Sequence, residues 1–126
     1  MEFISSYAIT IMLGLQLAII LFHVFILVKI IPYKITWGGR LKNDSQMYAF
    51  EIISILINLF LSLVLLIKAN MVRDIFSSKT VDIILWVFLI LFILNTIGNI
   101  FAKTLLEKYF TFLTIIAAAL IFQILR

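Results

Sequence analysis

Four long, almost uninterrupted apolar runs dominate this chain of 126 residues. Each run is close to the ~20 residues that an α-helix needs to cross a bilayer core of ~30 Å. They cover about residues 7–31, 50–67, 81–102 and 109–125. Apolar residues make up 65% of the chain and charged residues only 13%, whereas a soluble domain has about 45–50% and about 25%. The sequence therefore predicts an all-α, integral membrane four-helix bundle, with residues 1–126 as one transmembrane domain.

Three connections join the predicted spans. The first, about residues 32–48, contains turn residues together with Trp37 and Arg40, which suit an interfacial turn against lipid headgroups. The only proline, Pro32, is expected to end the first span. The second connection, about residues 70–80, fits a short loop or a surface helix. The third, around residues 103–108, is so tight that spans three and four must be antiparallel neighbours.

The basic residues give a small preference for one orientation in the cell membrane. On the side of loops one and three lie six of them, Lys29, Lys34, Arg40, Lys42, Lys103 and Lys108. On the other side lie four, Lys68, Arg73, Lys79 and Arg126. This excess favours loops one and three in the cytoplasm and both termini outside. Because the difference is small, a dual topology is the alternative.

Several kinds of chemistry are excluded by composition. The chain has no cysteine, which excludes disulfides, thiolate metal sites and thiol nucleophiles. Its single histidine, His23, excludes a His-rich metal site within one protomer. The net charge of +4 lies in short loops and helix ends, where it indicates topology and lipid contact rather than a nucleic-acid surface. No cofactor and no metal are predicted.

Polar residues inside the spans are the most informative feature, because such residues are costly in a membrane and usually face the bundle interior or mark function. In span two they share one helix face, at Glu51, Ser54, Asn58 and Ser62. The other spans contribute Gln16, His23, Asn95, Asn99, Lys103, Glu107, Thr111 and Thr114.

The depths of these residues indicate a polar half-core. Measured from the side of loops one and three, His23, Asn58 and Asn95 lie ~10–13 Å into the bilayer at 1.5 Å per residue. The opposite halves of the spans are almost pure hydrocarbon. The candidate ligand-binding residues are His23, Glu51, Ser54, Asn58, Asn95, Asn99, Lys103 and Thr114. For the Ser, Thr and Asn residues the alternative is an interhelical hydrogen bond worth ~0.6–2 kcal/mol. For Glu51 and Lys103 it is an interfacial side chain that extends to the headgroups, and for His23 it is a core histidine with its hydrogen bonds satisfied.

The charged residues support a site but no particular reaction. Glu51 could pair with Lys103 or Arg40, and Asn58 could hold the imidazole of His23. A buried His–Glu pair can shuttle protons. The sequence contains no recognisable nucleophile–base–oxyanion set, no Gly-rich phosphate loop and no paired catalytic carboxylates. No catalytic residue is therefore predicted.

Three short segments resemble those of uncharacterised small bacterial four-span membrane proteins. They are WGGR at residues 37–40, FE at 50–51, and NTIGNIFAK at 95–103 followed by EK at 107–108. The resemblance covers most of the chain and implies a four-span fold and a membrane location, but no activity. The chain does not resemble fluoride channels, because their polar track and Phe box are missing. It also departs from small multidrug transporters, because its first span lacks their membrane-embedded glutamate.

Three classes of function follow as hypotheses. In the first, the bundle binds or transports a small solute, an ion or a lipid headgroup in the polar half-core, as a homo-oligomer. The second is a membrane interaction protein, either an immunity-type protector or an accessory subunit of a larger complex. The third is an enzyme that acts on a lipid, with Glu51 or His23 as the acid–base group. Membrane lipids are the expected surroundings in every case, and nucleic acid is not an expected partner.

Overall fold

The computed structural model describes residues 2–33, 41–101 and 105–125 of the chain. These residues form four α-helices and no strand: α1 (Glu2–Leu27), α2 (Asp44–Lys68), α3 (Ser78–Ile100) and α4 (Leu105–Leu125). Each helix contains a segment long and apolar enough to cross a bilayer. The prediction of an all-α four-helix bundle is confirmed, and the chain is a small multi-pass membrane protein.

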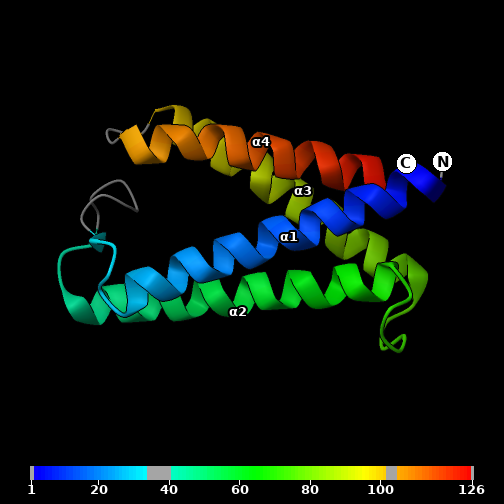
Figure 1. The fold of residues 1–126 in the computed structure, drawn as a ribbon, viewed down its shortest axis with the longest axis horizontal. Helices are drawn as coiled ribbons and strands as arrows, with labels where there is room; N and C mark the ends of the chain where they lie inside the picture. Colours follow the sequence, from blue (N-terminus) through cyan, green and yellow to red (C-terminus); the bar gives the residue numbers. More distant parts are fainter. Residues whose placement is uncertain (1, 34–40, 102–104, 126) are drawn as a thin grey trace.

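The helices form two antiparallel pairs, α1 with α2 and α3 with α4 (Figure 1). Helix α3 packs most extensively against α4, as the tight third connection predicts, and α1 packs against both α2 and α4. The contact between α2 and α3 is the smallest of the four. Helix α1 therefore joins the two pairs, and one side of the bundle, between α2 and α3, is less completely filled.

Two helices end in the same way, with a residue in the left-handed conformation. Lys29 has φ 67°, and the next amide, of Ile30, donates to the carbonyl of Phe25 at 2.8 Å. Asn70 has φ 59°, and the amide of Met71 donates to the carbonyl of Leu66 at 3.0 Å. These are the hydrogen bonds of a Schellman motif, which satisfies carbonyls at a helix end. The expectation that Pro32 ends the first helix is wrong, because this motif ends it at Leu27.

Side-chain caps determine where two helices begin. The Asn43 side chain accepts a hydrogen bond from the amide of Gln46 ahead of α2, and the Ser77 side chain accepts one from Thr80 ahead of α3. Both helices therefore begin before the apolar runs predicted as spans. Between Lys68 and Ser78 the chain is a loop without a helix, so the surface-helix alternative for the second connection is wrong.

The apolar core lies mainly in the half of the bundle near loop two and the chain termini. All four helices contribute to it, with Met12, Leu61, Val64, Leu65, Leu85, Ala117 and Ile121 among its members. A much smaller cluster of Ile26, Leu41 and Met47 lies near loop one. Between these two clusters the contacts of α1 with α2 become polar.

Candidate functional site

A buried acid–imidazole pair joins α1 to α2. The carboxylate of Glu51 lies 2.5 Å from Nδ1 of His23, and Glu51 is 0% exposed. Either the ring N–H donates to the carboxylate or a protonated carboxyl donates to the ring nitrogen, so the two groups can share or exchange one proton. Removing a carboxylate from water is costly, and the imidazole offsets part of that cost.

A pair of amides lies two helical turns deeper along the same contact. Nδ2 of Asn58 donates to the carbonyl of Ser54 at 2.7 Å, which orients the Asn58 carbonyl oxygen toward α1. Nε2 of Gln16 then donates to Oδ1 of Asn58 at 2.9 Å and to its backbone carbonyl at 3.2 Å. The orientation of the Gln16 amide is thus determined by two acceptors at once.

This arrangement leaves a polar atom without a partner. Gln16 is 0% exposed, and among the described residues its Oε1 has no donor. The buried hydroxyl oxygen of Thr111, on α4, likewise has no hydrogen-bond partner among them. An unsatisfied buried polar atom costs about 1–3 kcal/mol. Native proteins leave few buried polar atoms unsatisfied, so these two atoms are exceptions among the described side chains.

The second helix pair contributes a hydroxyl contact at Thr96 and Thr114, whose oxygens lie 2.7 Å apart. Each oxygen also lies within hydrogen-bond distance of a carbonyl one turn earlier in its own helix, that of Phe92 for Thr96 and that of Phe110 for Thr114, so two hydroxyl protons are shared among these three contacts. Such back-bonding satisfies a hydroxyl within a single helix. The Thr96–Thr114 contact therefore acts as interhelical hydrogen bonding, the alternative open for any such residue.

An aromatic contact places the start of α4 beside the Glu51–His23 pair. The rings of Phe22 and Phe110 meet edge to face, with centroids 5.0 Å apart. Glu107, near the start of α4, is also buried. The buried polar residues of the described chain are Gln16, Glu51, Thr96 and Glu107, and they include two acids and neither lysine nor arginine. The described half-core is consequently rich in hydrogen-bond acceptors.

The predicted site residues do not all come together. His23, Glu51, Asn58 and Thr114 make hydrogen bonds between helices. Ser54 is half-buried, and its backbone carbonyl accepts from Asn58 of the same helix. Asn99 is half-exposed, and Asn95 is exposed on α3. The buried stripe of α3 passes through Thr96, and Asn95 is turned about 100° away from it. Lys103, Trp37 and Arg40 lie outside the described residues, so neither of the pairings expected for Glu51 is tested.

The expected partner of Asn58 was different. It was expected to hold the imidazole of His23, but Asn58 contacts Gln16 and His23 contacts Glu51. A signal for this pairing was present in the spacing. Gln16 precedes His23 by seven residues, as Glu51 precedes Asn58 by seven, so two antiparallel helices align both pairs at once.

Glu107 and Thr111 are among the polar residues that the sequence places inside the spans, but not among the candidate ligand-binding residues; Glu107 is buried and Thr111 is half-buried. Thr96, which is buried, is absent from both sets. Among the residues described, no group of three His, Cys, Asp or Glu side chains could hold a metal ion.

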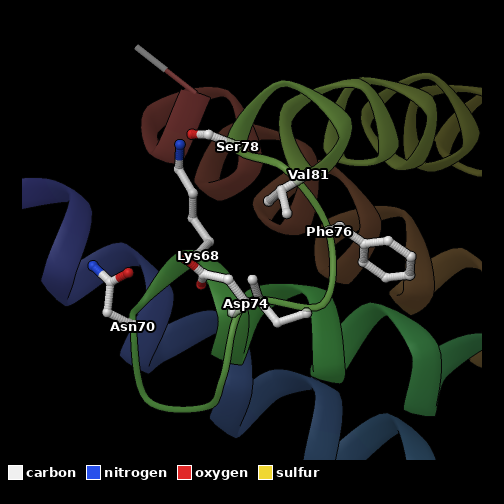
Figure 2. A pocket seen from close by; sticks show the side chains of 7 residues that line it. Lys68, Asn70, Asp74, Phe76, Ser78 and Val81 are labelled. Atoms are coloured by element: carbon white, nitrogen blue, oxygen red, sulfur yellow. The ribbon is translucent and has the colours of Figure 1, made fainter.

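A second polar region lies at the opposite end of the bundle, around loop two. A hollow of about 240 Å³ is lined by Lys68 and Asn70, by Asp74 and Phe76 from the loop, and by Ser78 and Val81 from the start of α3 (Figure 2). Lys68 forms an ion pair of 2.8 Å with Asp82. This ion pair joins the end of α2 to the start of α3. We therefore interpret the hollow as part of the structural connection between the two helices.

Comparisons with known proteins found no match in a scan of protein-family models, among curated proteins or among solved structures. The resemblance to small bacterial four-span proteins therefore stays a prediction. Four membrane-length helices and a polar contact beneath loops one and three are the basis for assigning a function.

Proposed function

We propose that this protein is a binding and transport protein for a small polar solute or ion, held in the polar half-core beneath loops one and three. The observation that carries the proposal is the fully buried Glu51 paired with His23 at 2.5 Å. Buried ionisable residues in membrane helices are expensive and most often serve ion or proton pathways. A bundle held together only by packing would place apolar residues at both positions.

The polar atoms of the half-core favour a ligand that donates hydrogen bonds or carries a positive charge. The unpartnered atom of Gln16 is an acceptor and the two buried titratable residues described there, Glu51 and Glu107, are acids. A protonated amine can donate a hydrogen bond to the unpartnered oxygen of Gln16, and a small monovalent cation can be coordinated by it. Of the ligand types predicted from sequence, a cation or an amine-bearing solute agrees best with these atoms.

The His23–Glu51 pair gives this site a way to couple binding to a proton. A cation that approaches Glu51 competes with the imidazole for the carboxylate, and the displaced proton can leave through His23. Asn58 and Gln16 lie deeper and orient the solute by hydrogen bonds. A ligand that enters from the side of loops one and three would meet His23 and Glu51 first. It would meet Gln16 and Asn58 two helical turns deeper.

Ligand-induced stabilisation tests the proposal. The protein in lipid nanodiscs is heated with Na⁺, K⁺, ethylammonium, glycine or acetate, and the unfolding midpoint is followed by circular dichroism. A ligand that binds only the folded state stabilises it in proportion to its occupancy. We expect at least one cation or amine, and not acetate, to raise the midpoint, and we expect Glu51→Gln to abolish the shift.

The matched control is Asp82→Asn, which removes a carboxylate at the opposite end of the bundle and should keep the shift. Flux of the stabilising ion into vesicles containing the protein then separates transport from binding alone. The proposal is wrong if no member of the panel shifts the midpoint, or if Glu51→Gln retains the full shift.

A second candidate function, that of a membrane interaction protein, is favoured by one observation. A groove of about 500 Å³ between α2 and α3 is lined only by apolar side chains, which include Leu56, Phe60, Val87 and Leu91. A helix of another protein could lie in it. Purification in mild detergent would then yield a partner at a fixed ratio, and substitutions in the groove would remove that partner without affecting ligand binding.

A further inference from the structure

Asn95 is a polar residue in an unexpected place. It lies on α3 five residues before the helix ends at Ile100, and it is exposed. At 1.5 Å per residue this is about 7.5 Å inside the end of the helix. Among the described residues, no hydrogen bond to the Asn95 side chain is present. Its neighbours on the exposed surface, Leu91 and Leu94, are apolar, as residues facing lipid should be.

An exposed asparagine at this depth has no route to water. A lysine can extend its long side chain to the interface, but an amide on a single methylene group cannot. Hydrocarbon offers no hydrogen-bond partner, so an amide that faces lipid is left unsatisfied. The Asn95 side chain therefore requires a partner from outside this bundle.

The surface around Asn95 permits close approach of another helix. Leu91, Asn95 and Gly98 follow one another at intervals of four and three residues, which places them on one stripe of α3. A Cβ atom added to Gly98 would meet nothing within 4 Å, so the backbone is open there. Leu91 also lines the apolar groove between α2 and α3, so the stripe continues into that groove.

We propose that this stripe is a homodimer interface, in which α3 of one protomer packs against α3 of a second copy and Asn95 pairs with its counterpart. An amide both donates and accepts, so two copies of the same side chain satisfy each other across a two-fold axis. This self-complementarity is the reason for a second copy rather than a different protein. The inference does not rest on the proposed function, since Asn95 lies away from the Glu51–His23 pair.

The position of Asn95 also determines the relative orientation of the two copies. The centre of α3 is at Leu89, six residues or about 9 Å from Asn95. In an antiparallel pair of α3 helices the two amides would lie about 18 Å apart, too far to touch. Only a parallel pair, with both copies inserted in the same orientation, brings them together. The interface thus argues against a dual topology for this chain.

Cysteine crosslinking tests the interface directly, because the natural chain has no cysteine. Single-cysteine variants Leu91→Cys and Gly98→Cys are oxidised in membranes, beside Phe112→Cys, an exposed position on α4. We expect disulfide-linked dimers at the two α3 positions and little at Phe112. Equal crosslinking at all three, or crosslinking only at Phe112, would overturn the proposal.

The role of the amide is tested by dimerisation in vesicles at increasing lipid dilution, followed by energy transfer between labelled copies. Asn95→Leu should weaken the dimer by about threefold to thirtyfold, as expected for an interhelical hydrogen bond. Asn95→Gln keeps an amide and should retain most of the association. Gln123→Leu, which removes a half-exposed amide on α4, is the matched control and should have no effect. Dimerisation unchanged in Asn95→Leu, or a monomeric wild-type protein, would refute the interface, whatever ligand the half-core binds.

Discussion

The contact between α1 and α2 has two halves that differ completely in chemistry. Near loop two, Met12 on α1 and Leu61 and Leu65 on α2 are fully buried members of an apolar core. Toward loop one, the same two helices meet through Gln16 with Asn58 and His23 with Glu51. The helices, their antiparallel order and their lengths are shared, so the difference lies in side chains alone.

The two halves of the contact therefore differ in role: the apolar half packs the bundle, and the polar half contains the groups that could bind a ligand. Packing in the apolar half needs no proton, no partner and no guest. The polar half contains a buried carboxylate that is paired with His23. It also contains an amide oxygen without a partner among the described residues, which reduces stability. The loop-two half therefore acts as the structural support, and the half beneath loops one and three is where function is expected.

The largest effect should come from breaking the acid–imidazole pair. His23→Leu removes the imidazole from a fully buried carboxylate, and losing one member of a buried ion pair typically costs about 3–5 kcal/mol. Unfolding by SDS in mixed micelles, followed by circular dichroism, measures this loss. In the double variant His23→Leu with Glu51→Leu, most of the stability should return. A single variant as stable as the wild type would show that Glu51 is held by other contacts.

The next effect belongs to the apolar half. Leu65 is fully buried, and Leu65→Ala should cost about 2–4 kcal/mol through lost packing and a new cavity. Ligand-induced stabilisation should persist, because the substitution lies outside the polar half. Leu59→Ala, at an exposed position of the same helix, should change the stability by less than about 0.5 kcal/mol. Loss of binding in Leu65→Ala at intact folding would erase the proposed separation of the two halves.

A smaller effect on stability, with a large one on binding, is expected at the amide pair. Gln16→Leu leaves Oδ1 of Asn58 without its donor and should cost about 1–2 kcal/mol. Adding Asn58→Leu removes the orphaned group and should restore stability to near the wild-type value. Both variants should lose the ligand-induced rise in the unfolding midpoint. A double variant that is stable and still binds would show that these amides serve only as interhelical contacts.

The smallest effect lies outside the membrane, at the start of loop one. The carboxylate of Asp44 hydrogen-bonds Lys29 at 2.6 Å and raises the pKa of that lysine above its ordinary value. Burial, and a hydrogen bond to Asp44, raise the pKa of Tyr33. The folded state thus holds both protons more tightly than the unfolded chain.

This contribution to stability is fully present below the ordinary pKa values, near 10, and is lost as the pH rises through the raised ones. Stability measured between pH 9 and pH 12 should fall slightly more steeply in the wild type than in Lys29→Met. Lys42→Met, in the same loop, should follow the wild-type curve. Identical curves for all three proteins would show that the Lys29–Asp44 contact is too screened to matter.

The sequence by itself determined the number of helices, their membrane-spanning character and the concentration of polar residues toward one end. Run length and composition decide these features, because a bilayer accepts only long apolar helices. Seven-residue spacings also placed Gln16 with His23 and Glu51 with Asn58 on common helix faces. The sequence pattern thus determined which residues share a face of their own helix.

Only the tertiary structure decided which faces meet. The rotation of each helix about its axis depends on packing against all its neighbours at once. A periodic sequence pattern shows which residues share a face, but not which neighbouring helix that face contacts. That rotation pairs His23 with Glu51 rather than with Asn58, and it buries Gln16 against Asn58. It also turns Asn95 outward while Thr96, one residue later, is buried. A shift of about 100° around one helix therefore separates a residue inside the bundle from one on its exposed surface.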